Sequence, residues 1–241
     1  MKFNITCITA AVALSVFGGS AAQAQQAEGW YAAGSLGYNR MQDETINGIG
    51  ASFGRQPGGS TNPDGGELLS GSVGWAFSNG LRLELEGSFA RNDISSATAG
   101  SLHDAPASGG EDKTSLFANA LYDFGKTSWG IAPYAGIGVG STRAKWRNLQ
   151  VSSATETVGF DDSVSKAAYQ GILGFSFLDN AVPGCLFTLE YRYRALDGGR
   201  TYSGEVERSR IGAFPVTADL GSSHDQALTF GVRYQFGARA K

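Results

Sequence analysis

Charged and apolar side chains alternate at every second position in two stretches of the chain, and a third stretch carries one arginine in the same pattern. The order around residue 84 is Leu-Arg-Leu-Glu-Leu-Glu, and around residue 190 it is Leu-Glu-Tyr-Arg-Tyr-Arg. A period of two places the charges of a β-strand on one face. Carboxylates and guanidiniums on one buried face must form ion pairs. We call this set the charge network; it comprises Arg82, Glu84, Glu86, Glu190, Arg192 and Arg233.

Other polar motifs do not combine into a reactive site. His103 and His224 are the only histidines, and both lie in segments expected to be loops. The acidic pairs at 111–112 and 161–162 could hold a divalent cation, but charge pairs in loops are usually solvated. Cys185 is the only cysteine after residue 24, and no cluster of cysteine and histidine is present. No catalytic residue, cofactor site or metal site is therefore predicted.

Eight stretches of alternating character supply the strands that would position these charges. Phe117 and Leu121 interrupt the alternation of the fourth stretch. Each stretch has close to the roughly 9–11 residues with which a tilted strand crosses a membrane. The expected strands are 30–39, 68–77, 81–89, 114–124, 131–142, 166–177, 185–194 and 227–236.

The connections between these strands alternate between long and short. The long ones are 40–67, 92–113, 143–165 and 195–226, and the short ones are 78–80, 125–130 and 178–184. This asymmetry is typical of outer-membrane barrels, which have short periplasmic turns and long outer loops. We therefore predict an all-β fold, an eight-stranded antiparallel up-and-down transmembrane β-barrel, with the long connections as mobile loops.

Composition and the amino-terminal segment agree with an exported barrel. Charged residues make up 17% of the chain, below the roughly 25% of soluble domains, and 35 of the 241 residues are Gly. No stretch after the first thirty residues approaches the about 18 apolar residues of a spanning helix. Residues 1–24 have a lysine, an apolar run and an Ala-Gln-Ala end, which indicates a signal peptide; a retained anchoring helix is the alternative. Residues 25–241 then form one barrel domain.

The distribution of apolar and aromatic residues favours a membrane protein. The apolar face of most strands carries almost no charge and would contact lipid, while the charge network would point inward. A soluble lipocalin-like barrel, with the apolar face as its core, is the alternative. Aromatic residues near strand ends are expected to form two interfacial girdles. They are Trp30, Trp75, Phe77, Tyr122, Phe124, Trp129, Tyr234 and Phe236 at the short turns, and Tyr38, Phe89, Trp146 and Tyr193 near the long connections.

Several segments, taken together in their order and spacing, resemble a known family. They are GWYAAGSLGY at 29–38, NALYDF at 119–124, PYAGIGVG at 133–140, LEYRY at 189–193 and LTFGVRYQF at 228–236. The chain is similar to the small outer-membrane β-barrel family that includes the OmpA-type transmembrane domain and the opacity-type surface porins. The resemblance covers essentially all of the chain after residue 24. It implies a Gram-negative outer-membrane location, insertion by the barrel assembly machinery, and a structural, adhesive or weak pore role.

The resemblance also sets the candidate functions. Some eight-stranded barrels of this kind modify lipid A with a His-x-Ser pair on a lipid-facing strand; here Ser222-x-His224 has the reverse order, so no enzyme is predicted. We predict a structural or surface protein with at most a narrow pore, plugged by the charge network because eight strands leave little free bore. A gate for small solutes and a loop-mediated adhesin or surface receptor are alternatives, and a lipid A-modifying outer-membrane enzyme is the weakest alternative. The expected partners are outer-membrane lipid and lipopolysaccharide, the barrel assembly machinery, and an extracellular ligand at the long connections, with no nucleic acid.

Overall fold

The fold consists of antiparallel strands joined into one hydrogen-bonded sheet. The computed structural model describes residues 28–51, 54–99, 102–152, 157–178, 182–208 and 212–237, and thirteen strands are found there. The fold is therefore all-β. Within these ranges, no helix has the length and apolar character needed to cross a membrane. The predicted signal peptide at 1–24 lies outside the described residues.

Eight of the thirteen strands lie where the alternation predicted strands. They are β1 (Gly29–Met41), β4 (Gly65–Ala76), β5 (Leu81–Ala99), β6 (Leu102–Asp123), β7 (Ile131–Ser152), β9 (Ser163–Leu178), β10 (Cys185–Leu196) and β13 (Ser223–Gln235). Each pairs with two others of this group, and the pairing runs in that order from β1 to β13 and back to β1. We call this cycle the proximal ring. No backbone edge is left open around it, as a lipid environment demands.

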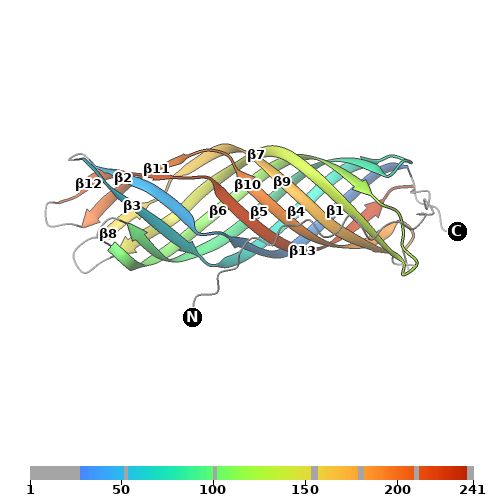
Figure 1. The fold of residues 1–241 in the computed structure, drawn as a ribbon, viewed down its shortest axis with the longest axis horizontal. Helices are drawn as coiled ribbons and strands as arrows, with labels where there is room; N and C mark the ends of the chain where they lie inside the picture. The colour runs from blue at the N-terminus through green and yellow to red at the C-terminus, as the bar shows by residue number, and fades with distance from the viewer. Residues whose placement is uncertain are drawn as a thin grey trace.

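The long connections are mostly strands, so the prediction of mobile loops at 40–67, 92–113, 143–165 and 195–226 is wrong. They contain β2 (Glu44–Ala51), β3 (Gly54–Pro63), β8 (Thr157–Phe160), β11 (Arg200–Arg208) and β12 (Phe214–Leu220). These five strands and the long ends of β5, β6 and β7 pair in a second closed cycle, which we call the distal ring. Figure 1 shows the five short strands gathered at one end of an elongated tube.

The distal ring continues the proximal ring strand by strand. Only one to three residues separate β1 from β2, β3 from β4, β8 from β9, β10 from β11 and β12 from β13. Backbone hydrogen bonds hold these breaks together: Gln42 N donates to His224 O (2.9 Å), and Asp197 N donates to Ala167 O (3.0 Å). The two rings are therefore stacked end to end as one tube.

The wall of the proximal ring carries apolar side chains outside and polar ones inside. Many of the outward Leu, Val, Phe, Tyr and Trp side chains are more than a third exposed. We call this outward surface the apolar belt. On each strand the belt runs from one outward residue to another. The ends are Trp30 and Tyr38 on β1, Leu69 and Trp75 on β4, Leu81 and Phe89 on β5, Leu116 and Tyr122 on β6, Ile131 and Val139 on β7, Tyr169 and Phe177 on β9, Phe187 and Tyr193 on β10, and Leu228 and Tyr234 on β13.

The distal ring reverses this arrangement, with an apolar interior and a polar exterior. We call its buried apolar cluster the distal core; it comprises Ile46, Ile94, Trp146, Leu149, Phe160, Tyr202, Val206, Val216, Ala218 and Leu220. Such a wall suits a tube surrounded by water, because apolar side chains are then removed from water and polar ones are left in it. The two rings therefore differ in which face of the wall is apolar: the outer face in the proximal ring and the inner face in the distal ring.

Trp146 was expected in an interfacial girdle, but it lies inside the tube. Its side chain is 1% exposed and stacks on Tyr202 inside the distal core, with ring centroids 4.2 Å apart. On β7 the outward positions are odd-numbered, so the even-numbered Trp146 must face inward. Of the other girdle residues, Trp129 is 87% exposed in the short turn at 125–130, and Tyr38 is exposed at the distal edge of the apolar belt.

Candidate functional site

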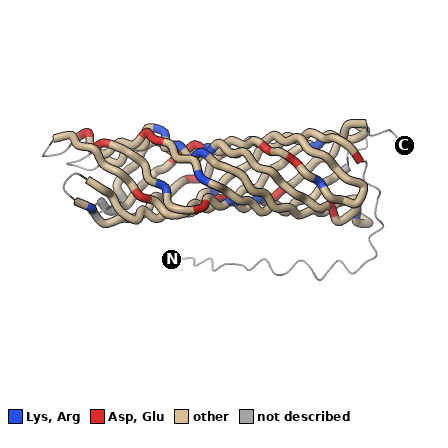
Figure 2. Tube along the Cα trace, turned by 90° about the horizontal axis from the view of Figure 1, so that it is seen from above, with Lys and Arg blue, Asp and Glu red and all other residues tan. Residues whose placement is uncertain are grey.

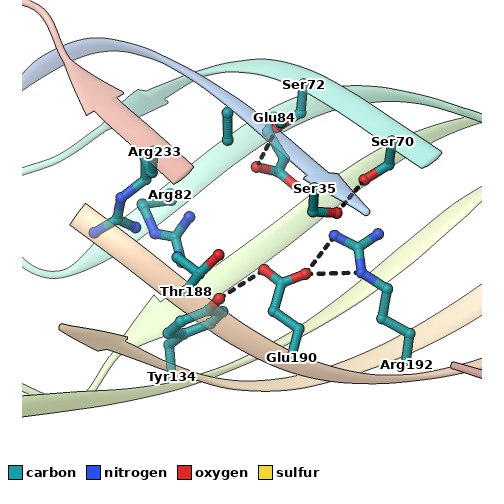
Figure 3. A pocket seen from close by; sticks show the side chains of 12 residues that line it. Ser35, Ser70, Ser72, Arg82, Glu84, Tyr134, Thr188, Glu190, Arg192 and Arg233 are labelled. Carbon is teal, nitrogen blue, oxygen red and sulfur yellow. Dashed lines mark hydrogen bonds and ion pairs between the residues drawn. The ribbon is translucent and has the colours of Figure 1, made fainter. Parts of the chain in front are cut away.

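The interior of the proximal ring gathers the charge network. Arg82, Glu86, Glu190, Arg192 and Arg233 expose 9% of their surface or less, and Glu84 is half-buried. β5 and β10, which carry five of the six, lie four strands apart in either direction around the ring. Their inward side chains therefore meet across the bore. Figure 3 shows several of them around one small cavity.

Glu86, Glu190 and Arg192 form the centre of the network. Arg192 Nη1 lies 2.6 Å from Glu86 Oε1, and Arg192 Nη2 lies 2.6 Å from Glu190 Oε2. Arg194 Nη2 donates to the same Glu86 oxygen at 3.0 Å, and Tyr134 OH donates to Glu190 Oε1 at 2.6 Å. Each carboxylate in this low-dielectric interior thus has at least one guanidinium partner, which offsets the cost of burying it.

Glu84 is held by neutral donors. Tyr31 OH donates to its Oε2 at 2.8 Å, and Asn119 Nδ2 donates to its Oε1 at 2.9 Å. Asn119 also accepts a hydrogen bond from Gln170 Nε2 at 2.8 Å. Gly138 makes room for this contact, because a Cβ atom there would collide with Asn119 Oδ1. Polar side chains thus connect Glu84 to the rest of the network.

Arg82 and Arg233 depend on a residue that the sequence analysis did not include. Arg82 forms a two-point contact with Asp123, with Nε to Oδ2 at 2.9 Å and Nη2 to Oδ1 at 3.2 Å. Arg233 Nη1 lies 3.7 Å from the same Oδ2. Four guanidiniums therefore balance four carboxylates, where three of each were expected. Asp123 lies between the outward residues Tyr122 and Phe124, so the alternation of the strand places it on the inward face. This position was the signal in the sequence that could have identified it.

The interior packs closely around these groups. The cavity in Figure 3 has a volume of about 20 Å³ and is lined by Arg82, Glu84, Tyr134, Glu190 and Arg192 among others. This volume holds a water molecule or two, since one water needs at least about 10–15 Å³. Phe117 and Leu121, which interrupt the alternation, point inward and are almost fully buried. The charge network is therefore packed among side chains and does not line an open channel.

A second charged group lies where the two rings meet, and we call it the waist cluster: Glu44, Glu111, Lys113, Arg200 and Asp225. Arg200 contacts Glu44 at 2.6 Å and Glu111 at 2.7 Å, and Lys113 Nζ lies 2.8 Å from Asp225 Oδ1. Burial and the neighbouring Glu44 raise the pKa of Glu111 to about 6, against the opposing effect of Lys113 and Arg200. Its neighbour Asp112 faces outward beyond the apolar belt, so this cluster lies outside the lipid-facing part of the tube. Figure 2 shows positions of both signs close together along the middle of the molecule.

The distal core closes the tube beyond the waist. Trp146 packs edge-on against Phe160, with ring centroids 5.1 Å apart, and the cavity beside it has a volume of about 40 Å³. An apolar zone of this kind opposes the passage of ions, because an ion entering it loses its hydration. The bore is thus obstructed at three levels, of which the sequence analysis predicted only the first.

The remaining candidate motifs do not assemble into a reactive site within the described ranges. His224 is the second residue of β13 rather than part of a loop, and its Nδ1 is 2.9 Å from Tyr193 OH. The side chain of His103 lies outside what the structure describes. Of the acidic pair at 161–162, Asp161 contacts Lys145, and Asp162 accepts the backbone N–H of the distal strand β11 at Ser203. No group of three or more His, Cys, Asp or Glu that could hold a metal is found in the described part of the chain.

Comparisons with known proteins agree with a tube whose outer wall is apolar in one half. The model of the family described as "Outer membrane protein beta-barrel domain" matches residues 9–236. The chain belongs to this family. The resemblance inferred from the sequence is therefore confirmed, and the protein is located in the outer membrane of a Gram-negative type of cell. The soluble lipocalin-like alternative does not agree with this location.

One curated protein and two solved structures are similar to this chain. A curated protein named "Outer membrane protein" from Gluconacetobacter diazotrophicus is 29% identical over 227 residues, which cover 83% of this chain and 55% of that protein. The chain thus spans about half of that relative's length. The outer membrane protein OprG from Pseudomonas aeruginosa has a TM-score of 0.59 at 16% identity, over 88% of this chain and 99% of that one. Neisserial surface protein A has a TM-score of 0.48 at 18% identity, over 88% and 100% of the two chains. At these identities, the likeness to OprG concerns the fold alone.

Proposed function

We propose that the proximal ring is an eight-stranded transmembrane barrel and that the distal ring stands outside the cell. The reversal of apolar and polar faces between the two rings supports this arrangement. The apolar belt matches the outward band of a membrane barrel, whereas the distal exterior is polar. The turns at 78–80 and 125–130 then lie on the periplasmic side, where such barrels have their short connections.

We further propose that the protein is a closed structural scaffold that displays the distal ring at the cell surface. The observation that carries this proposal is the packed interior: among the described residues, the cavity in the charge network has a volume of about 20 Å³ and the cavity beside the distal core about 40 Å³. Eight strands leave a bore that side chains can fill, so a packed interior is expected for this strand number. At most a narrow pore for small solutes is compatible with it.

A surface receptor or adhesin is the second candidate. The distal ring is a closed ladder of hydrogen-bonded strands and holds its outward side chains in a fixed arrangement. Rigid presentation lowers the entropy cost of binding an extracellular partner. The adhesin or receptor expected from the sequence would bind its partner with mobile loops. In this candidate, the outer wall of the distal strands binds the partner instead.

Two measurements test the proposal. The mature protein should fractionate with the outer membrane and migrate differently on a gel before and after boiling, because its closed ladder resists detergent. Refolded into planar bilayers, it should show little or no single-channel conductance. A large, steady conductance would contradict the closed scaffold, and recovery as a folded protein from periplasmic extract without detergent would contradict the transmembrane barrel.

A further inference from the structure

Three strands of the described chain take part in both rings. They are β5, β6 and β7, and we call them the spine. Each of the other five positions of the wall is filled by two strands, such as β1 and β2, with a break of one to three residues between them. These five breaks are neighbours around the tube, and we call them the seam. The two rings are therefore joined by regular strands on one side and by short irregular segments on the other.

Backbone hydrogen bonds close the seam. At each break an N–H donates to a carbonyl at 2.8–3.1 Å: Gln42 to His224, Asp64 to Asp93, Trp146 to Asp162, Asp197 to Ala167, and Gly221 to Thr45. The longest break, at 197–199, is exposed, and Gly198 within it has a φ of 76°, which favours glycine. Segments of this kind open at a lower free energy than a continuous ladder of strands.

The spine is irregular just beyond the level of the seam. Asp93 on β5 lies at this level, because its carbonyl accepts the bond from Asp64. The register of β5 with β6 shifts beyond Asp93, and that of β6 with β7 shifts around Gly109, whose φ is 110°. On β7, Asn148 has a φ of 44°. Irregularities of this kind bend strands. A line of them across the tube from the seam is the geometry of a hinge.

Arg200 connects the seam side of the distal ring to the spine. It is fully buried on β11, directly after the break at 197–199. Its guanidinium contacts Glu44, which follows the break at 42–43 on β2, and Glu111 on β6. Both β11 and β2 are three strands away from β6 around the distal ring, so these contacts cross the bore. Breaking them is strongly unfavourable, because it leaves buried charges without a partner.

We propose that the distal ring is a hinged cap and that Arg200 is its latch. The ring tilts at the irregular points of the spine, and the seam opens on the opposite side, at the level of the waist cluster. While Arg200 contacts both carboxylates, the seam stays closed. Without these contacts, the backbone hydrogen bonds of the breaks hold it more weakly. This motion follows from the strand pairing and is the same whichever side of the membrane the distal ring faces.

A single cysteine beside the seam tests whether it opens. Met41 is 2% exposed inside the tube, and the break at 42–43 follows it directly. Mature protein carrying Met41→Cys and Cys185→Ser is refolded in detergent and treated with a bulky polyethylene glycol maleimide. This reagent should reach the thiol only when the seam opens. Arg200→Met removes the charge, keeps an apolar stem, and should speed the labelling about tenfold, because two charge-assisted contacts are lost.

Two controls separate opening of the seam from a general loosening of the tube. Arg82→Met removes another buried guanidinium, whose partner Asp123 lies inside the proximal ring, and should leave the labelling of Met41→Cys unchanged. Ala144→Cys moves the thiol to the spine, where Ala144 is fully buried on β7. This thiol should stay protected in Arg200→Met. Each variant is first checked for the gel shift on boiling, so that a failure of the barrel itself is seen separately.

Hydrogen exchange of the wild-type protein tests the hinge even if Arg200→Met does not fold. Strand amides at 38–41 and 193–196 flank the seam, and those at 112–115 and 142–145 lie on the spine; all are paired in the ladder. The seam side should exchange faster, because only that side opens. Equal exchange on the two sides would overturn the hinge.

The labelling experiment can also contradict the proposal in two ways. Equal labelling of Met41→Cys in Arg200→Met and Arg82→Met would remove the role of Arg200 as the latch. Equal labelling of Met41→Cys and Ala144→Cys in Arg200→Met would show that the whole waist loosens rather than one side of it.

Discussion

Removing the Glu86 carboxylate is the sharpest test of the charge network. Glu86 is 1% exposed and accepts hydrogen bonds from Arg192, Arg194 and Asn119. In Glu86→Ala, Arg192 keeps its contact with Glu190, and Arg194 keeps the hydrogen bond from its Nε to Gln170 Oε1 at 3.0 Å. Arg194 then has lost the carboxylate that paired with it.

The expected loss of stability is about 3 kcal/mol. Deleting one partner of a buried ion pair costs about 3–5 kcal/mol, and water entering the bore places this case at the lower end. With a urea slope of roughly 1–3 kcal/mol/M, the unfolding midpoint should fall by about 1–3 M. The assay is tryptophan fluorescence of protein refolded into lipid vesicles and titrated with urea.

Glu205→Ala is the matched control, because Glu205 is exposed on β11 and its removal leaves the interior unchanged. Arg192→Glu should destabilise the barrel more than Glu86→Ala, since it brings a third carboxylate between Glu86 and Glu190. If Glu86→Ala unfolded at the same urea concentration as Glu205→Ala, the buried contacts would not act as a coupled network and the reasoning would be refuted.

Three further predictions concern topology, pH and the bore. A membrane-impermeant thiol reagent added to whole cells should label Thr217→Cys on β12 but not Asn79→Cys in a short turn; the reverse pattern would invert the barrel. Because the folded pKa of Glu111, about 6, lies above its ordinary value of 4.5, its contribution to stability is fully present below pH 4.5 and is lost as pH rises through 6. This loss is about 2 kcal/mol. In Glu111→Gln, the urea unfolding midpoint should therefore change less between pH 4.5 and 6.5 than in the wild type. An unchanged pH dependence of the midpoint would assign the loss of stability to other groups. The double variant Glu86→Ala, Trp146→Ala should conduct more in planar bilayers than either single variant, because it weakens two of the three obstructions and each single variant weakens one; equal conductance would show that a single obstruction, such as the waist cluster, controls the bore.

The proximal strands could be predicted because their two faces differ strongly. In Leu81–Phe89 every outward residue is apolar or Gly, and the inward ones are Arg, Glu or Ser. A one-residue shift of such a strand would place charges in lipid, so the pattern fixes both the strand and its orientation. Short turns such as 78–80 then limit the strand ends.

The distal strands were missed because their alternation is the reverse of the proximal one and uses smaller residues. In β2 the inward residues include Glu44 and Ile46, while Thr45 and Asn47 point outward. Many outward positions there are Ser, Thr, Gly or Asn, a composition that is also typical of loops. The alternation of Trp146, Leu149 and Val151 with polar neighbours was present in the sequence, but the shift after Trp146 breaks its period. At Asn148 the backbone has a φ of 44°, which accounts for that shift.

The pairing within the site could be predicted only in part. The odd or even position of a residue in a strand gives the face on which its side chain lies, so the six members of the charge network could be named. It does not give the level along the tube axis at which residues of two strands meet. This level decides whether Arg82 contacts Glu84 or Asp123. The waist cluster depends on Arg200 and Glu44, which lie in segments whose strands were not recognised. Their partners therefore could not be inferred from the sequence.

The two kinds of obstruction restrict how the protein can act. An ion-pair network excludes apolar solutes because its ion pairs would have to break to admit them. An apolar core excludes ions because the ions would lose their hydration. In the proposed scaffold, a bore with both in series, the charge network followed by the distal core, is closed to both classes of solute. The chemistry that remains accessible then lies on the outer wall. In the proposed arrangement, the apolar belt faces lipid and the distal strands face the medium. Variation on this wall, rather than in the bore, is where we expect differences in binding to arise.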